Sequence, residues 1–463
     1  MAPSDVASVA APARVPAAWL AQAARNLPRY TSYPTALAFG AAEDDATARD
    51  WLQAIRPDQA LSIYTHVPFC RRLCWYCGCH TTVVHEYGRV RAYYETLRRE
   101  IDLWAEALPE HAGARHLHFG GGSPNALGPA DFADLVERLR RAFSVTADAE
   151  VAAELDPGML SPAFIDAAIA AGVNRVSLGV QTFDPEVQRR VNRIQPFDRV
   201  AAVVGRLRWA GVKGLNLDLM YGLPGQTPEN VAASVRDAVT LEPDRVAVFG
   251  YAHVPWMKKH QVMIDAAELA DAEGRWAQAD AADQALVEAG YVRIGLDHYA
   301  RPDDPLAVAA ASGRLRRNFQ GYTDDPAPVM IPVGPSSIGR FGPGFVQNAA
   351  ATDVWTRAVE AGRLPVARTL AVTEEDELRA AVIERLMCDL QVDVGAVCAG
   401  RGFPVDALDA AFPALAELEA LGLCRVRGRM VQTPAEAARL VRAVAACFDA
   451  RLPDGARRHA AAV

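Results

Sequence analysis

Two features of the sequence predict an α/β fold built on parallel strands. Between residues 60 and 255, six short runs of β-branched or apolar residues alternate with longer helical patterns. Strands that alternate with helices in this way form parallel sheets with right-handed crossovers. Pro129 and Pro228 also stand where the first turn of a helix tolerates proline. Six such units form either an open doubly wound sheet or a partial barrel.

Polar or glycine-rich motifs follow the expected strands, always at the same end. A cysteine-rich run follows the first strand, and "GGGSP" follows the second. Glu154 ends the third strand, Gln181 ends the fourth, and Asp218 lies late in the fifth. Because parallel strands share one carboxyl edge, we expect these groups to form one rim. The expected strands are 61–67, 114–121, 150–157, 175–181, 214–224 and 245–252, with helical patterns at 89–108, 129–143 and 227–241.

The rest of the chain divides into parts before and after this core. A capping box, "TEED" at 373–376, begins the last part, and a helix, a short hairpin and a second helix are expected within 412–448, as in a winged helix. In an acidic chain we expect a lid or packing module there rather than a DNA reader. The expected parts are a flexible leader (1–24), an N-terminal arm (25–60), a barrel with its extension (61–365) and a mostly helical C-terminal domain (366–463).

Composition and charge narrow the class of protein. The chain has 463 residues, 51% of them hydrophobic, and a formal net charge of -8. No apolar run approaches the ~18 residues of a membrane span, and the negative charge gives no support for nucleic-acid binding. Cys388, Cys398, Cys424 and Cys447 are scattered singly, which suits a reducing cytoplasm rather than a disulfide framework. No repeat or coiled coil indicates assembly, so we expect a monomer.

The other four cysteines crowd into one short loop. Cys70, Cys74 and Cys77 have the spacing C-x3-C-x2-C directly after the first strand. Thiolates bind both zinc and iron–sulfur clusters. A structural zinc site usually has two pairs of ligands, and here Cys79 or His80 would have to complete it from very close by. A cubane cluster fits better, because three thiolates hold three irons and leave the fourth open to a ligand.

These motifs resemble those of the radical S-adenosylmethionine (SAM) enzymes, in which the same cysteine spacing follows the first strand and a glycine-rich loop follows the second. Further segments narrow the resemblance to the oxygen-independent coproporphyrinogen III oxidases, from about residue 25 to the C-terminus. The resemblance implies a partial (βα)6 TIM-like barrel of the radical SAM type with a smaller, mostly helical C-terminal domain. The segments are "PRYTSYPTA", "YTHVPFC", "CGCH", "EVAAELDP", "GVQTFDPEVQRRVNR", "LDLMYGLPGQT", "FGYAHVPW", "DHYARPDD" and "RNFQGYT".

The resemblance also implies roles for individual residues. Cys70, Cys74 and Cys77 would ligate a [4Fe-4S] cluster. From their place between the cysteines, we expect Trp75 and Tyr76 to shield the cluster edge and tune its potential. Cys79 would lie nearby without being a ligand, and the residues expected to be catalytic are Cys79, Tyr64 and Arg29. The first of two SAM molecules would be held by Tyr64, Gly121 and Glu154. The second would be held by Gly122, Ser123, Gln181, Arg193 and Asp218, and Ala252 and Ile338 would add backbone or apolar contacts with SAM.

The reaction implied by the resemblance converts two propionates of coproporphyrinogen III to vinyls, giving protoporphyrinogen IX. A reductase and an electron acceptor, neither identified by the sequence, would serve as partners. Because the substrate carries four carboxylates, its pocket should be basic. Arg29 is the first candidate, since it lies in the arm, where Tyr30 and Tyr33 either stack on the tetrapyrrole or pack the arm down. The other candidates are Lys258, Lys259, Arg301, Arg316, Arg317 and Arg340.

Three other functions remain open from the residues alone. A haem-trafficking paralogue would keep the cysteines but bind haem without decarboxylation, although such paralogues generally lack the N-terminal arm and the "CGC" extension present here. A radical SAM methyltransferase that degrades haem would differ in its product. A zinc-stabilised regulator would hold zinc in place of iron and sulfide, and would read DNA with its C-terminal module.

Overall fold

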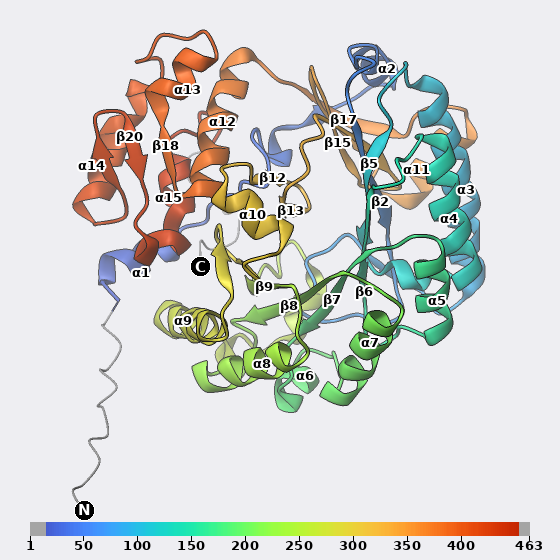
Figure 1. The fold of residues 1–463 in the computed structure, drawn as a ribbon, viewed down its shortest axis with the longest axis horizontal. Helices are drawn as coiled ribbons and strands as arrows, with labels where there is room; N and C mark the ends of the chain where they lie inside the picture. The colour runs from blue at the N-terminus through green and yellow to red at the C-terminus, as the bar shows by residue number, and fades with distance from the viewer. Residues whose placement is uncertain (1–14, 453–463) are drawn as a thin grey trace, which may run out of the picture.

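One curved sheet organises the part of the chain that the computed structural model describes, residues 15–452 (Figure 1). Its 13 strands have the order β1-β17-β16-β15-β14-β2-β5-β6-β7-β8-β9-β11-β10. The six predicted strands are parallel neighbours in chain order, so the predicted α/β class is confirmed. The third, fifth and sixth end earlier than predicted. The six are β2 (Leu61–Val67), β5 (Ala114–Gly121), β6 (Glu150–Leu155), β7 (Arg175–Gln181), β8 (Gly214–Tyr221) and β9 (Arg245–Gly250).

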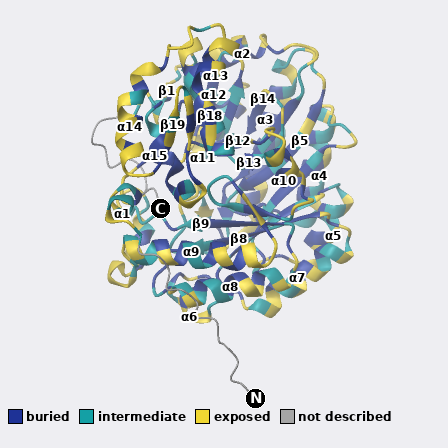
Figure 2. Cartoon of the chain, turned by 60° about the vertical axis from the view of Figure 1, so that its left-hand side comes forward, coloured by how far each residue is buried: buried dark blue, intermediate teal, exposed yellow. Residues whose placement is uncertain are grey.

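Helices join these strands and cover the outer face of the sheet (Figure 1). Pro129 and Pro228 begin α4 and α8, as predicted, because a first-turn residue needs no N–H donor. Buried residues line the strands, while exposed ones lie on the outer helical surfaces (Figure 2). No helix within 15–452 is long and apolar enough to cross a membrane. The helices are α3 (Tyr87–Ala107), α4 (Pro129–Ala142), α5 (Pro162–Ala170), α6 (Pro185–Arg190), α7 (Phe197–Trp209), α8 (Pro228–Thr240) and α9 (Ala272–Glu288).

The segment after residue 255, which looks irregular in sequence, extends the sheet at both edges. β14 runs parallel to β2, and β15, β16, β17 and β1 continue antiparallel beyond it, while β11 and β10 are added antiparallel to β9. The carboxyl ends of β2 and β5–β9 therefore have further structure on either side. The added strands are β10 (Val292–Ile294), β11 (His298–Ala300), β14 (Val329–Val333), β15 (Ile338–Phe341), β16 (Gly344–Asn348) and β17 (Val366–Ala371), with β1 (Gly40–Ala41) from the N-terminal arm. The segment also contains α10 (Pro305–Ala311), α11 (Thr352–Glu360) and a separate two-stranded sheet of β12 (Arg316–Asn318) and β13 (Gly321–Thr323).

The N-terminal residues that the structure describes are folded onto the rest of the chain. Residues 1–14 of the expected leader lie outside the described residues, but Ala17–Ala23 forms helix α1, which differs from the flexible leader predicted there. Trp19 contacts Trp276 of α9 with 5.9 Å between ring centroids, and its Nε1 donates to Leu421 O over 2.7 Å. Helix α2 (Ala46–Leu52) follows in the arm.

The C-terminal elements gather on the side away from α4 and α5 (Figure 1). Thr373 and Asp376 form the predicted capping box at the start of α12, and the predicted helix, hairpin and helix are present. Strand β17 belongs to the large sheet, so these elements begin after Ala371 rather than at residue 366 as predicted. The elements are α12 (Glu374–Asp389), β18 (Gln391–Asp393), α13 (Val394–Gly400), α14 (Phe412–Ala420), β19 (Arg425–Arg427), β20 (Met430–Gln432) and α15 (Val441–Ala446), with sheet order β18-β20-β19.

Candidate cofactor site at the carboxyl edge of the parallel strands

The loop that carries the cysteines is fixed at its base by a short parallel ladder. β3 (Phe69–Cys70) pairs with β4 (Thr82–Val83), so the two ends of the cysteine loop lie side by side. Thr81 Oγ1 donates a hydrogen bond to Cys70 Sγ over 3.2 Å. Within the loop, Cys77 N donates to Cys74 O over 3.1 Å. The loop therefore has a defined conformation at both ends.

The thiols of this loop influence one another electrostatically. Burial raises the pKa of Cys70 to about 11, and the charges of Cys77 and Cys74 add to the rise. A hydrogen bond from Cys79 lowers the pKa of Cys77 to about 6, with further lowering from His260 and Lys258. Neighbouring thiolates repel each other, and cationic irons would relieve this repulsion, so the donor set fits a soft metal cluster.

The thiols are not arranged around a single ion. Among residues 15–452, no three His, Cys, Asp or Glu side chains form a group that could hold one metal ion. The thiolates of a cubane cluster each bind a different iron, so they are spaced more widely than ligands that share one ion. In such a cluster Cys70, Cys74 and Cys77 would each bind a different iron.

A segment after β9 covers the cysteine loop. Lys258 Nζ donates to Cys79 O over 2.9 Å, and His260 Nε2 donates to Cys77 O over 2.8 Å. Gln261 Nε2 donates to Tyr76 O over 3.0 Å. Lys258 therefore contacts the loop backbone, although the sequence analysis places it among substrate contacts. The rings of Trp75 and Tyr76 pack against a small apolar cluster of Val187, Val191, Leu223, Tyr251 and Ile264.

The glycine-rich motif ends β5 where other groups approach closely. A Cβ on Gly120 would lie 2.8 Å from Glu154 Oε2, and one on Gly121 would lie 2.7 Å from the His66 ring. Gly121 also has φ +111, a conformation that L side chains rarely adopt. Glycine at these positions lets the backbone of β5 lie against Glu154 of β6 and His66 of β2.

Two histidines that the sequence analysis does not single out connect this part of the site. His118 Nε2 donates to Glu154 Oε1 over 2.8 Å, and its ring stacks on Tyr64 with 5.8 Å between centroids. Tyr64 Oη donates to His66 Nδ1 over 3.2 Å, and His66 Nε2 donates to His80 O over 2.9 Å. Burial lowers the pKa of His66 to about 4, so this histidine is neutral at pH 7. The sequence signal for both is a histidine near the carboxyl end of an expected strand.

Glu154 is ionised at neutral pH although it lies inside the site. Burial raises the pKa of Glu154, but the hydrogen bond and charge of His118 outweigh this effect, so the pKa lies below its usual value. Its side chain is 43% exposed. An accessible carboxylate at a strand end can accept hydrogen bonds from an ammonium group or from ribose hydroxyls.

On β7 and β8, half-buried polar residues alternate with buried apolar ones. Ser177 Oγ donates to Asp218 Oδ2 over 2.9 Å, and Asn216 Nδ2 donates to Asp218 Oδ1 over 2.7 Å. Burial, followed by the charge of Glu154, raises the pKa of Asp218 to about 6. Asp218 is therefore held in place as a second carboxylate close to Glu154.

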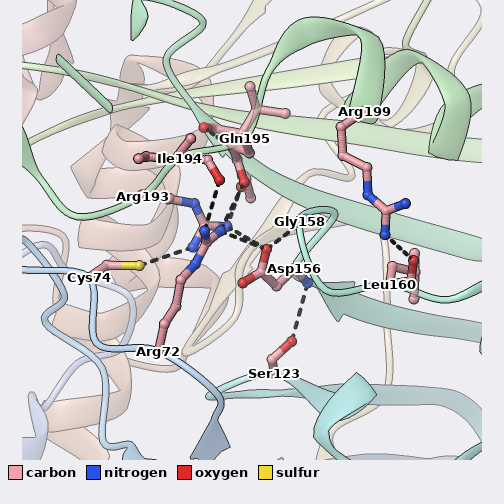
Figure 3. A network of polar contacts seen from close by, with 12 residues as sticks. Arg72, Cys74, Ser123, Asp156, Gly158, Leu160, Arg193, Ile194, Gln195 and Arg199 are labelled. Carbon is pink, nitrogen blue, oxygen red and sulfur yellow. Dashed lines mark hydrogen bonds and ion pairs between the residues drawn. The ribbon is translucent and has the colours of Figure 1, made fainter. Parts of the chain in front are cut away.

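Arg193 connects the cysteine loop to β6 and β7 (Figure 3). Its Nη1 donates to Cys74 Sγ over 3.2 Å, its Nη2 lies 3.5 Å from Asp156 Oδ1, and it also donates to Gly179 O. Arg72, which the sequence analysis does not single out, lies 3.2 Å from the same Asp156 oxygen. Asp156 N donates to Ser123 Oγ over 3.2 Å, which brings the glycine-rich motif into the same network.

The remaining predicted cofactor residues lie at the ends of the same strands or on their extension. Gln181 ends β7 with φ 71, and Gly122 directly follows β5, where a Cβ would lie 2.6 Å from Phe69 O. Ile338 begins β15, which pairs with β16. Ala252 O accepts a hydrogen bond from Gln261 Nε2 over 3.2 Å. The structure thus brings together the cysteine loop, the glycine-rich motif and the two carboxylates.

Several predicted substrate contacts have partners within the protein or lie away from the carboxyl edge of the sheet. Arg301 N donates to Asp244 O just before the start of β9, at the opposite edge of the sheet. Arg316 pairs with Glu384 at 3.0 Å, and Arg340 pairs with Glu377. Tyr30 and Tyr33 are 3% and 5% exposed; Tyr30 Oη donates to Asp449 Oδ2, and Tyr33 Oη accepts from Ala450 N. The two tyrosines therefore pack the arm down.

Known proteins resemble this chain in sequence and in fold. The family described as the radical SAM superfamily matches residues 64–238. The chain is 47% identical over 438 residues to an oxygen-independent coproporphyrinogen III oxidase from Bradyrhizobium diazoefficiens, covering 95% of this chain and 97% of the relative. The solved structure of coproporphyrinogen III oxidase from Escherichia coli, described as a radical SAM enzyme, has a TM-score of 0.87 and 35% identity, covering 92% of this chain and 100% of that chain. The chain therefore belongs to the family of oxygen-independent coproporphyrinogen III oxidases.

Proposed function

We propose that this chain carries out the oxygen-independent oxidative decarboxylation of coproporphyrinogen III to protoporphyrinogen IX in haem biosynthesis. The observation that carries the proposal is the position of the cysteine loop. It leaves β2 at the edge where the glycine-rich motif and Glu154 also lie. Each propionate loses carbon dioxide, one proton and two electrons to become a vinyl group. The chemistry is radical, so it needs no general acid–base pair.

The cofactors are a [4Fe-4S] cluster and SAM. When bound, they would supply the reductive cleavage of SAM and the radical that takes a hydrogen from the propionate β-carbon. Cys70, Cys74 and Cys77 hold the cluster in this proposal. Tyr64, Gly121 and Glu154 hold the first SAM, and the ionised Glu154 is suited to one of its cationic or hydroxyl groups. A second SAM is held by Gly122, Ser123, Gln181, Arg193 and Asp218, with Ala252 and Ile338 lining the SAM sites.

The protein's own residues position these groups and exclude water. Arg193 donates a hydrogen bond to Cys74 Sγ and so orients this side chain. Tyr76, within the cysteine loop, packs against the small apolar cluster that includes Val191 and Tyr251, which limits solvent at that side of the loop. Cys79 stays next to Cys77, where we propose that it acts in the reaction without binding iron. The proposal places the enzyme in the cytoplasm as a monomer that takes electrons from a separate reductase and passes the second electron of each decarboxylation to an acceptor.

The test is anaerobic turnover by the reconstituted protein. Coproporphyrinogen III, SAM and a chemical reductant are supplied, and protoporphyrinogen, carbon dioxide and 5'-deoxyadenosine are measured. We expect all three from the intact protein and none from Cys77→Ser. Tight haem binding with no decarboxylation would instead favour the haem-trafficking function, and zinc in place of iron and sulfide would favour the regulator.

A further inference from the structure

The imidazole of His298 lies where the extension of the sheet meets the parallel strands. His298 begins β11 and lies opposite Ala247 of β9 in the antiparallel pairing of these two strands. Its ring packs at a steep angle against two aromatic rings, with centroid separations of 5.7 Å to Phe249 and 5.3 Å to Tyr322. Burial raises the pKa of Asp218 on β8, and the charge of His298 acts against this rise, so the two side chains lie near each other. The ring is therefore fixed beside the cofactor site.

One of the two ring nitrogens of His298 has a fixed partner. Nδ1 lies 2.7 Å from Asp297 Oδ1. Burial raises the pKa of Asp297, but the hydrogen bond and charge of His298 outweigh this effect. The charges of Arg317 and Arg29 add to the lowering, so the pKa of Asp297 lies well below its usual value. Asp297 is therefore ionised at neutral pH and can only accept a hydrogen bond, so Nδ1 carries a proton.

The other ring nitrogen, Nε2, is open to a ligand. Among residues 15–452, no hydrogen bond reaches Nε2, although the His298 side chain is only 14% exposed. A Cβ on Gly321 would lie 3.7 Å from this nitrogen, so even the smallest side chain there would lie against it. Gly321 also has φ +126, which L side chains rarely adopt. A half-buried nitrogen without a protein partner needs a ligand or water to complete its hydrogen bonds.

The rings that pack against His298 also contact two arginines. Arg29 Cζ lies 5.9 Å from the centre of the Phe249 ring. Arg317 Cζ lies 4.2 Å from the centre of the Tyr322 ring, and its Nη1 is buried without a hydrogen-bond partner in the described part of the chain. Both guanidinium groups donate to backbone carbonyls, and no carboxylate of residues 15–452 lies within 4 Å of either. An anion that reaches His298 would therefore meet these positive charges as well.

We propose that His298 is a substrate-binding residue, whose Nε2 donates a hydrogen bond to one carboxylate of the tetracarboxylate substrate. Asp297 holds Nδ1–H, so Nε2 is the nitrogen left for the ligand, and a bound carboxylate favours the imidazolium form that donates from it. Asp297 offsets one of the three positive charges of His298, Arg29 and Arg317, so an anion is still attracted. This inference rests on the proposed function, because it assumes a substrate with several carboxylates.

Two ligands of the proposed reaction carry a carboxylate, namely the substrate and the methionine part of SAM. Most residues around His298 come from the N-terminal arm, β11, β12 and β13. None of these four segments carries a residue proposed above to hold SAM. The surroundings of His298 therefore favour the substrate as the source of the carboxylate.

The test measures binding of coproporphyrin III, the stable oxidised form of the substrate, to the cluster-loaded protein without oxygen. The variant His298→Phe keeps an aromatic ring between Phe249 and Tyr322, and His298→Gln keeps an N–H donor. The control is His116→Gln, because His116 also lies beside an aspartate, 3.0 Å from Asp325, but near the amino end of β5.

The two variants should lose affinity to different extents. We expect His298→Phe to bind coproporphyrin III about 10- to 100-fold more weakly, because a charge-assisted hydrogen bond is lost. His298→Gln should bind it about 3- to 10-fold more weakly, because a neutral donor replaces a charged one. His116→Gln should bind like the intact protein. The tetramethyl ester, which has no carboxylate, should bind the intact protein and His298→Phe equally.

Turnover separates a binding role of His298 from a structural one. We expect the KM for coproporphyrinogen III to rise in His298→Phe while kcat, cluster content and SAM affinity stay the same, because the lost contact is made equally before and during the reaction. If SAM affinity falls and coproporphyrin affinity does not, His298 serves the methionine carboxylate and the inference is overturned.

Equal affinity of both His298 variants and the intact protein for coproporphyrin III also overturns the inference. His298→Gln decides the matter alone should His298→Phe not fold. In that case conversion of the substrate by the intact protein would leave the proposed function standing, whereas failure of the intact protein to bind or convert it would reject the proposed function itself.

Discussion

Arg193 Nη1 donates a hydrogen bond to Cys74 Sγ over 3.2 Å, although the two residues are 119 positions apart in the chain. Both are 8% exposed. The same guanidinium approaches Asp156, which also pairs with Arg72 (Figure 3). One side chain thus links the loop expected to bind the cluster to the carboxyl edges of β6 and β7. The link makes Arg193 a residue through which cluster and SAM binding can be separated experimentally.

We expect Arg193→Gln to keep the cluster but to bind SAM about 10- to 100-fold more weakly, because a charged hydrogen-bond donor is removed from the site while the three cysteines remain. Iron and sulfide content and equilibrium dialysis with SAM measure the two effects. Arg199→Gln is the matched control, since Arg199 donates to Leu160 O over 2.6 Å beside the network and contacts no cysteine (Figure 3). Loss of iron from Arg193→Gln would show that Arg193 serves the cluster itself.

The cysteines of the loop should respond differently to replacement by serine. Cys70→Ser, Cys74→Ser and Cys77→Ser should each lose cluster absorbance and SAM cleavage, because a hydroxyl is a poor ligand for iron in a cluster. Cys79→Ser should keep the cluster, since Cys79 N and its side chain act on Cys77 as hydrogen-bond donors and serine retains both donors. We expect much of the activity to be lost even so. A Cys79→Ser protein without iron would make Cys79 a ligand.

Because the pKa of Asp218 is raised, we expect the affinity for the second SAM to depend on pH. Burial and the charge of Glu154 raise its pKa to about 6, so this carboxylate gains a proton as the pH falls through about 6. If the ionised form holds a cationic SAM, the affinity should fall about fourfold between pH 7.5 and pH 5.5, the range over which the ionised fraction drops. Equilibrium dialysis with SAM at several pH values measures this change in affinity.

Asp218→Asn should bind SAM more weakly and without this pH dependence. Asp166→Asn is the control, because Asp166 pairs with Arg206 on the outer surface and is 50% exposed. An unchanged pH profile in Asp218→Asn would assign the dependence to another group.

The sequence allows the order of the parallel strands and the location of the site to be predicted because both follow from local patterns. Alternating strands and helices determine the order, and motifs that follow strands must share the carboxyl edge. Thr373 and Asp376 were recognisable for the same reason, since a capping box lies within four residues. The positions of Cys70, Cys74 and Cys77 after β2 were likewise readable from their spacing.

Contacts between distant segments could not be predicted in this way. The partners of Tyr30 and Tyr33 lie at 449 and 450, and the pairing of Arg316 with Glu384 depends on how α12 packs. Arg301 looked like a substrate contact because its charge is visible in the sequence, but its position at the amino edge of β9 is not. Charge alone does not reveal which end of a sheet a residue occupies.

We expect Glu100 of α3, which lies away from the site, to make the free energy of unfolding depend on pH. It is 0% exposed and accepts hydrogen bonds from Gly334 N, Asn348 Nδ2, Trp355 Nε1 and Trp104 Nε1. Burial raises its pKa to about 7, although these donors oppose the rise. A raised pKa means that the folded state holds the proton more tightly, so this group's contribution to stability falls as pH rises from the unfolded value to about 7.

The variant Glu100→Gln cannot titrate. Between pH 5 and pH 8, the unfolding free energy of the intact protein should therefore fall by up to about 3 kcal/mol relative to that of Glu100→Gln. Anaerobic urea unfolding at both pH values measures it, with Glu95→Gln on the exposed side of α3 as the control. A difference that does not change with pH would show that Glu100 keeps one protonation state throughout.

Arg29 provides a way to separate substrate binding from SAM cleavage. Its Nη2 donates to Gly250 O over 3.3 Å at the end of β9, and its own carbonyl accepts from Arg317 Nη2 over 3.3 Å. Deleting the arm would also remove the buried Tyr30 and Tyr33, and with them packing against the C-terminal elements. A single substitution is therefore the cleaner experiment, because the arm stays packed while one guanidinium is lost.

We expect Arg29→Ala to weaken binding of coproporphyrin III by about 1.5–3 kcal/mol, the usual worth of a hydrogen bond to a charged group. Cluster content and SAM cleavage without substrate should not change, since the Arg29 side chain donates to Gly250 O at the end of β9 rather than to the cysteine loop or Glu154. With substrate present, 5'-deoxyadenosine should rise relative to protoporphyrinogen, because the radical more often lacks a target. Arg25→Ala is the control on the same arm, where Arg25 Nη1 donates to Gln22 Oε1 at 2.9 Å. Conversion by Arg29→Ala at the intact rate and affinity would mean that the arm contributes packing alone.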